Sequence, residues 1–180
     1  AVINRLPWEQ TIDHFVGQEA CRFLDRYGAD GPFAMMVGFP GPHCPYDPTA
    51  EALANLDPTA MPPAVPPTEA AESLRKRNVE GNRHPWNGVD YDAFTPAQIR
   101  KVRTHYAASV QQIDHEVGQI LATLERLELL DNTIIIFSAD HGDYLGDHGM
   151  IGKGTFFEGS IHVPMIVRLP STGVSPSTST

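Results

Sequence analysis

Cysteines, basic residues and long apolar runs are all scarce in this sequence of 180 residues. Its two cysteines, Cys21 and Cys44, are too few for a disulfide framework, and neither belongs to a paired-cysteine zinc or redox motif. Thirteen Lys and Arg against 22 Asp and Glu give a net charge of −9 with no basic stripe, which argues against nucleic acid as a partner. No run reaches the roughly eighteen apolar residues of a membrane span, and residues 1–10 lack a secretion signal. We therefore expect a soluble protein with no membrane partner, and the sequence leaves open whether it is cytoplasmic or periplasmic.

The rest of the composition is that of an ordinary globular domain, with 41% hydrophobic and 19% charged residues. A single domain is expected over residues 1–170. Residues 171–180 are rich in Ser and Thr and are predicted to be a tail or a cut end. Because the chain also begins with Ala1 rather than Met, we expect a fragment of a longer protein.

Two segments have the apolar spacing of amphipathic helices. The first covers residues 11–27 and is followed by Gly28 as a stop signal. The second opens with a capping box at residues 95–98, has Pro at its first helical position, carries apolar residues at helical spacing as far as residue 127, and is expected to end near residues 130–132. Residues 69–91 show no firm pattern.

Three short apolar runs have the composition of strands buried on both faces, at residues 33–39, 133–138 and 163–169. Nine prolines between positions 40 and 67 predict an extended, irregular segment there. Helices that alternate with fully apolar strands predict an α/β fold, with a mostly parallel sheet flanked by helices.

A polar, glycine-rich segment follows the run at 133–138, at the sheet edge where ligands bind in open α/β folds. Its acids and histidines offer oxygen and imidazole donors for a divalent cation, and a solvated turn is the alternative interpretation. Asp140 and His141 can share a metal only if the chain leaves strand geometry, which Gly142 would permit. The others are expected to cap turns or support the ligands, and His148 is the best candidate among them for a direct role. These supporting residues are Asp143, Asp147 and His148.

The order of residues in this segment resembles a known family. The pattern Asp140-His141-Gly142-Asp143-x-x-Gly146-x-His148-Gly149-x-x-x-Lys153, followed by Glu158 and Val163-Pro164, resembles the second half of the sulfatase signature region in the alkaline-phosphatase-like superfamily. Its Asp-His form is similar to choline sulfatases, iduronate-type sulfatases and phosphonate monoester hydrolases. A second segment, Gly38-Phe39-Pro40-Gly41-Pro42-His43-Cys44-Pro45, resembles the Pro-His-x-Pro loop of the family. The resemblance implies a partial alkaline-phosphatase-like fold.

The resemblance also implies roles for four residues. Asp140 and His141 would bind a divalent metal, with Ca²⁺ expected first and Mn²⁺ or Mg²⁺ as alternatives. His43 and Lys153 would be the catalytic and substrate-binding contacts to the sulfate or to the leaving-group oxygen. A fixed Lys ammonium stabilises charge that develops on the transferred group, and a His can protonate the leaving oxygen. The partner would be a small-molecule sulfate or phosphonate ester, and oligomerisation is left open.

Other parts of the family pattern do not occur here. No C/S-x-P-S/A-x-R motif, whose first residue becomes the formylglycine nucleophile, is found, and the early Asp-Asp or Asp-Gln metal pair is also missing. We therefore expect residues 1–170 to be an incomplete sulfatase catalytic domain, without the nucleophile segment and the carboxy-terminal subdomain, and inactive alone. A fragment of a phosphonate monoester or phosphodiester hydrolase and a non-catalytic binding or scaffold relative are the two alternatives.

Overall fold

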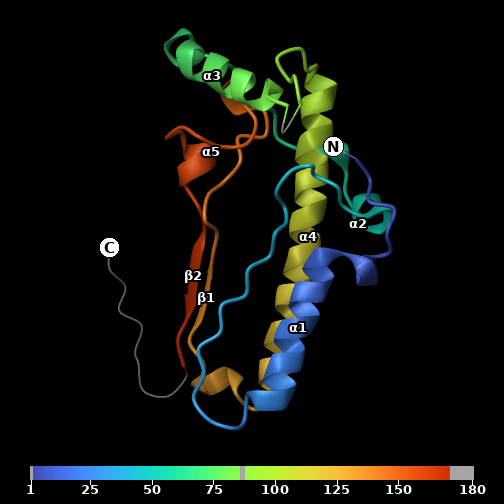
Figure 1. Cartoon of the computed structure of the whole chain (residues 1–180), viewed down its shortest axis with the longest axis vertical. Helices are drawn as coiled ribbons and strands as arrows, with labels where there is room; N and C mark the ends of the chain where they lie inside the picture. Colours follow the sequence, from blue (N-terminus) through green and yellow to red (C-terminus); the bar gives the residue numbers. More distant parts are fainter. Residues whose placement is uncertain (1, 86–87, 171–180) are drawn as a thin grey trace.

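A computed structural model describes residues 2–85 and 88–170, so the expected tail at 171–180 lies outside the described residues. Two long helices pack together, a two-stranded ribbon forms a second column, and one further helix crosses near one end of the molecule (Figure 1). The α-helices are α1 (Ile12–Tyr27), α2 (Ala50–Ala54), α3 (Glu72–Arg83), α4 (Pro96–Arg126) and α5 (Glu158–Ile161). The strands are β1 (Ile135–Ser138) and β2 (Met165–Arg168), and short 3₁₀ turns occur at Trp8–Gln10, Pro58–Ala60, Glu69–Ala71, Leu130–Asn132 and Asp147–Gly149.

Local capping explains the two predicted helices, and both are confirmed. The Thr11 hydroxyl accepts a hydrogen bond from the His14 amide at the start of α1, and α1 ends at Gly28. At the start of α4 the Thr95 hydroxyl accepts from the Gln98 amide, while the Gln98 side chain accepts from the Thr95 amide. The 31 residues of α4 make it the longest element. No helix in the described residues is both long enough and apolar enough to cross a membrane.

A buried charged group joins α1 to α4. The Glu116 side chain on α4 is fully buried, and its Oε1 lies 3.0 Å from both Trp8 Nε1 and His14 Nδ1. Gly17 on α1 packs against this carboxylate so closely that a Cβ atom would clash with it. A buried carboxylate needs such partners, because an unpaired charge away from water is strongly unfavourable. The pairing therefore sets how the two helices pack.

The two strands pair in the opposite direction to the one that the sequence predicts. β1 and β2 are antiparallel, with Ile136 opposite Val167 and Ser138 opposite Met165. The connection at 139–164 begins at the carboxyl end of β1 and brings the chain back to that same end. β2 therefore runs along β1 in the opposite direction. The predicted strand at residues 33–39 is extended but pairs with nothing in the described ranges. The expectation of parallel pairs is therefore wrong for this part of the sheet.

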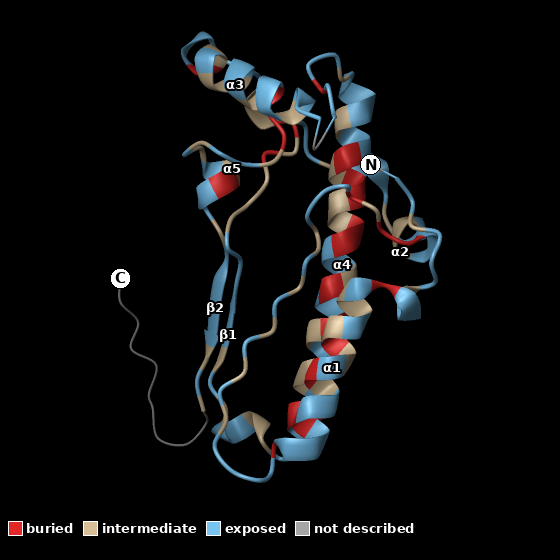
Figure 2. Ribbon diagram, viewed as in Figure 1, coloured by how far each residue is buried: buried red, intermediate tan, exposed pale blue. Residues whose placement is uncertain are grey.

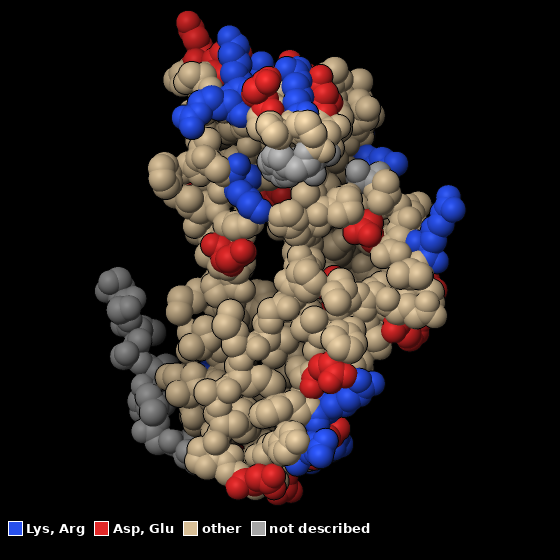
Figure 3. Space-filling view, in the orientation of Figure 1, with Lys and Arg blue, Asp and Glu red and all other residues tan. Residues whose placement is uncertain are grey.

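The apolar runs are also more exposed than predicted. Ile136 is 61% exposed, Ile166 is 63% exposed and Met36 is 97% exposed, where burial on both faces was expected (Figure 2). β1 and β2 pair only with each other among the described residues, and most of their residues are exposed. In Figure 3 the charged side chains gather over the α3 end and at the opposite end, while the surface over the strands carries few. The prediction that the runs at 133–138 and 163–169 form strands is confirmed, but most residues of these strands are exposed, so the predicted burial on both faces is wrong.

The main core lies beside the polar segment that follows β1. Buried side chains from the proline-rich loop, α3, the loop before α4, α4 itself and the stretch near residue 150 form one cluster. Partly buried residues surround it. The buried members are Tyr46, Val79, Tyr91, Val102 and Ile151, and those packed against them are Phe94, Ile99, Tyr106 and Leu145. This core fixes the proline-rich loop relative to the polar segment.

Candidate active site

The structure brings His43 and Lys153 into direct contact. Lys153 Nζ lies 2.9 Å from His43 Nε2, although the two residues are 110 positions apart in sequence. His43 Nδ1 lies 2.9 Å from the carbonyl oxygen of Cys44, which can only accept a hydrogen bond. The ring N–H therefore belongs on Nδ1, and Nε2 accepts from the Lys153 ammonium. The side chains of His43 and Lys153, which the sequence predicts to belong to one site, are therefore in contact.

The other predicted pair meets where the chain leaves β1. The strand ends at Ser138, and Asp140 lies in a bend that lets its side chain and that of His141 approach each other. The His141 amide donates to Asp140 Oδ1 over 2.9 Å, and Asp140 Oδ2 lies 3.4 Å from His141 Nε2. His141 Nδ1 lies 2.9 Å from the Gly142 carbonyl oxygen, so Nδ1 donates and Nε2 presents its lone pair. Metal-binding histidines in proteins commonly have this second hydrogen bond.

The donor chemistry of this pair fits a divalent cation, but the number of donors is small. A spacing of 3.4 Å between Oδ2 and Nε2 is close to the edge of an octahedron with bonds of about 2.3 Å, which is roughly 3.3 Å. Calcium prefers about six to eight ligands, and no group of three or more His, Cys, Asp or Glu residues that could bind a metal occurs in the described part of the chain. Asp140 and His141 thus form at most half of a metal site. That Asp140 and His141 bind a metal, and that this metal is Ca²⁺, both stay predictions.

Gly142 has a different role from the one that the sequence suggests. It is not among the glycines with positive φ, so it is not needed for a left-handed turn. Its amide donates to the Ser160 carbonyl oxygen over 2.8 Å, and a Cβ atom at this position would clash with the carbonyl oxygen of Gly159. The glycine is therefore required because the chain passes very close to α5.

Asp143 joins the proline-rich loop to the segment that carries Lys153. Its Oδ2 accepts from the Tyr46 hydroxyl over 2.7 Å, and its Oδ1 accepts from the amides of Leu145 and Gly152 at 3.0 and 2.9 Å. Burial and the Asp143 charge raise the pKa of Tyr46 far above its usual value, so the hydroxyl keeps its proton and donates. Asp143 supports the site, as the sequence predicts. The sequence does not predict the contribution of Tyr46, for which its place as an aromatic residue in a proline-rich loop is the one indication.

Electrostatic effects on two neighbouring groups relate the two pairs to each other. Burial raises the pKa of Tyr106, and the negative charges of Asp143 and Asp140 raise it further. Burial also raises the pKa of the Cys44 thiol, with Asp143 adding to the shift and Lys153 opposing it. The charges of Asp140 and Lys153 thus each act on a side chain that the charge of Asp143 also affects.

Asp147 and His148 stabilise the loop beyond Asp143. Asp147 Oδ1 accepts from the Val65 amide over 2.8 Å and pairs with Arg103, whose Nε donates to the Leu145 carbonyl oxygen. The His148 ring stacks on Phe157 with 4.3 Å between ring centroids, and its buried Nδ1 has no hydrogen-bond partner in the described residues. Asp147 supports the loop as predicted, and a direct role for His148 stays a prediction.

Comparison with known proteins identifies the family. The family model described as Sulfatase matches residues 3–179. The chain belongs to the sulfatase family. It is 33% identical over 180 residues to a choline-sulfatase of Rhizobium meliloti (strain 1021), covering 97% of this chain and 34% of the relative. It is 32% identical over 168 residues to iduronate 2-sulfatase of Homo sapiens, covering 88% of this chain and 30% of the relative.

Solved structures give the same fold. The phosphonate monoester hydrolase of Agrobacterium radiobacter matches with a TM-score of 0.76 and 26% identity, over 93% of this chain and 35% of that one. The predicted α/β class and partial alkaline-phosphatase-like fold are therefore confirmed. The sulfatase chain spans about a third of the length of these relatives.

Proposed function

We propose that the natural polypeptide containing this chain is a metal-dependent hydrolase of small-molecule sulfate esters. The observation that carries the proposal is the 2.9 Å contact between Lys153 Nζ and His43 Nε2, two residues 110 positions apart in sequence. The carboxylate of Asp140 and the imidazole of His141 form a second pair, with 3.4 Å between Oδ2 and Nε2. Because the chain spans about a third of its relatives, the activity is assigned to the longer polypeptide. The 180 residues alone are expected to be inactive.

The proposed chemistry of His43 and Lys153 follows from charge. Cleavage of the ester builds negative charge on the sulfuryl oxygens and on the departing oxygen, and fixed cations at these atoms lower the barrier. Lys153 would contact a sulfuryl oxygen through its compact ammonium group. His43 would protonate the leaving oxygen from Nε2 after that atom has taken up a proton from solvent in place of its hydrogen bond from Lys153, so that both ring nitrogens then carry a proton. A substrate oxygen that binds at this point therefore lies within reach of both groups.

Asp140 and His141 would supply two ligands to the cation, through Oδ2 and Nε2. A bound cation supplies Lewis acidity and activates a nucleophile. The nucleophile expected for the family is a formylglycine, and this sequence has no C/S-x-P-S/A-x-R motif that would form it. These 180 residues therefore contribute leaving-group, anion-binding and partial metal-binding groups.

Hydrolysis of phosphonate monoesters or phosphodiesters is the second candidate. It is favoured by the structural similarity to the Agrobacterium radiobacter phosphonate monoester hydrolase, with a TM-score of 0.76. Phosphoryl transfer also spreads negative charge over non-bridging oxygens, so the same Lys and His could serve either ester. The residues described here do not favour one central atom over the other, and the sulfatase relatives rank sulfate first.

The test compares two substrates on the natural full-length polypeptide. We expect a higher kcat/KM for p-nitrophenyl sulfate than for p-nitrophenyl phenylphosphonate, and the reverse order would make the second candidate correct. Lys153→Ala should lower kcat about a hundredfold, as loss of an oxyanion-stabilising donor does. Lys76→Ala is the matched control, because its ammonium on α3 is exposed and pairs with Glu72 on the same helix.

Metal analysis provides an independent readout. Asp140→Ala should remove the divalent cation measured by elemental analysis, whereas Asp57→Ala, which caps a turn elsewhere, should retain it. Absence of turnover on both esters together with absence of bound metal would support a non-catalytic relative instead. Turnover by the 180-residue chain alone would contradict the assignment of an incomplete site.

A further inference from the structure

Lys153 lies between two glycines, in a segment whose conformation depends on contacts with other parts of the molecule. Its neighbours Gly152 and Gly154 have φ angles of 75° and 118°, in the region that favours glycine. Among the described residues, no atom beyond those of the immediate chain neighbours lies within 4 Å of where a Cβ would stand at either glycine, and Gly152 is held by hydrogen bonds from its amide to Asp143 and from the Tyr144 amide to its carbonyl oxygen. A catalytic ammonium placed between two glycines needs restraint from elsewhere in the molecule.

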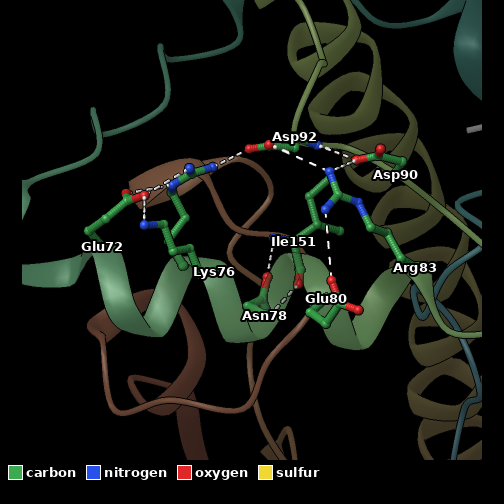
Figure 4. Close-up of polar contacts among 9 residues, drawn as sticks. Glu72, Lys76, Asn78, Glu80, Arg83, Asp90, Asp92 and Ile151 are labelled. Carbon is green, nitrogen blue, oxygen red and sulfur yellow. Dashed lines mark hydrogen bonds and ion pairs between the residues drawn. The ribbon is translucent and has the colours of Figure 1, made fainter.

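Asn78 on α3 supplies such a contact to Lys153 itself. Its Nδ2 donates to the carbonyl oxygens of Ile151 and Lys153 at 3.1 and 3.2 Å, and its Oδ1 accepts from the Ile151 amide at 3.2 Å. Among the hydrogen bonds of residues 2–85 and 88–170, the bond from Asn78 is the one that reaches the main chain of Lys153. Figure 4 shows Asn78 extending from α3 to Ile151.

The helix that carries Asn78 is itself fixed at several points. Val79 and Ile151 are both buried in the core cluster, so the apolar side of the contact is packed as well. On another side of α3, Arg83 pairs with Asp90 at 3.0 Å and Arg75 pairs with Asp92, which attaches the helix to the loop before α4 (Figure 4). The hydrogen bonds of Asn78 thus hold residues 151–153 at a fixed place relative to α3.

We propose that Asn78 is a positioning residue for Lys153, which sets where the ammonium meets His43 and the transferred group of the ester. The inference rests on the proposed function, because it assigns to Asn78 an effect on catalysis that passes through Lys153. The competing account is that Asn78 only attaches α3 to the 151–153 segment and contributes to stability. The two accounts differ in whether the effect of Asn78 requires Lys153.

A double-mutant cycle on the natural full-length polypeptide separates the two accounts. Displacing a catalytic group by about 1 Å can reduce turnover strongly, so we expect Asn78→Ala to lower kcat about tenfold and to change KM less. In the Lys153→Ala background, Asn78→Ala should lower kcat no further, because the group that it positions is gone. Asn78→Asp keeps an acceptor for the Ile151 amide and loses both donors, so it should reproduce the tenfold decrease.

Arg83→Ala is the matched control on the same helix. It removes ion pairs that attach α3 to the loop at 90–92 and leaves the contacts to Ile151 and Lys153 in place. Because Val79 still holds α3 in the buried core and exposed ion pairs contribute little, its kcat should stay within about twofold of the unmodified protein. A decrease equal to that of Asn78→Ala would overturn the proposal, because any loosening of α3 would then suffice.

The remaining outcomes distinguish this inference from the proposed function. An additive loss in the Lys153→Ala background, or an unchanged kcat for Asn78→Ala while Lys153→Ala is impaired, overturns the role of Asn78 and leaves the proposed function standing. An unchanged kcat for Lys153→Ala overturns both. If Asn78→Ala does not fold, as judged by circular dichroism, the cycle is run with Asn78→Asp, for which the same results are expected.

Discussion

Tyr46→Phe removes one hydroxyl from the connection between the two halves of the site. That hydroxyl donates to Asp143 Oδ2 over 2.7 Å, and the Tyr46 side chain is only 4% exposed. Hydrogen bonds to charged groups contribute about 1.5–3 kcal/mol, and the other Asp143 oxygen keeps its two amide donors. We therefore expect the free energy of unfolding to fall by about 2 kcal/mol. Because the pKa of Tyr46 is far above its usual value in the folded protein, the difference between the two proteins should shrink as pH rises above about 10, where the tyrosine of the unfolded chain ionises.

The measurement is urea unfolding of the natural polypeptide, followed by tyrosine fluorescence and circular dichroism. A lower midpoint with an unchanged slope reports a loss of native stability. Tyr106→Phe is the control, because Tyr106 is also partly buried near Asp143 and its hydroxyl makes no hydrogen bond with the residues described here. It should cost less than about 0.5 kcal/mol. Equal losses in the two variants would refute the reasoning, because the bond to Asp143 would then contribute nothing.

Three further predictions concern other parts of the chain. Burial lowers the pKa of His105 from 6.5, so the unfolded chain takes up the proton first and stability is lost as pH falls below that value. His105→Asn should flatten this dependence in unfolding measurements between about pH 7 and 5, and an unchanged slope would assign it to other groups. Gly142→Ala should destabilise by about 2 kcal/mol or more through its clash with Gly159, whereas Gly118→Ala in the open middle of α4 should be neutral or stabilising in thermal unfolding. Thr95→Ala should cost about 1 kcal/mol by loss of the α4 cap, and Thr95→Ser should restore most of it; equal values for the two would exclude the cap.

The helices could be predicted because their signals are local. The capping box at residues 95–98 and the stop at Gly28 each involve residues that are close in sequence, so the chain determines them without distant contacts. The strands could be located but not paired. The β-branched, apolar run at 133–138 indicates which residues form a strand. Whether the neighbouring strand is parallel or antiparallel to it depends on the path of the connection at 139–164. Burial depends in addition on which layers cover the strands.

The site divides in the same way. Asp140 and His141 are adjacent in sequence, so a break in the strand was enough to predict that they face each other. The contact between His43 and Lys153 could be expected only from the resemblance to sulfatases, since a lone lysine near a glycine is usually a surface residue. The role of Asn78 could not be predicted from the sequence, because its side chain hydrogen-bonds to the main chain of residues more than 70 positions away.

The central claim is that His43 and Lys153 share one active site with Asp140 and His141. The most direct test is a crystal structure of the natural full-length polypeptide grown with Ca²⁺ and inorganic sulfate. We predict a cation bound by Asp140 Oδ2 and His141 Nε2, with the sulfate within hydrogen-bond distance of Lys153 Nζ and His43 Nε2. A cation bound elsewhere, or a sulfate that contacts neither Lys153 nor His43 while all four side chains are ordered, would contradict the claim.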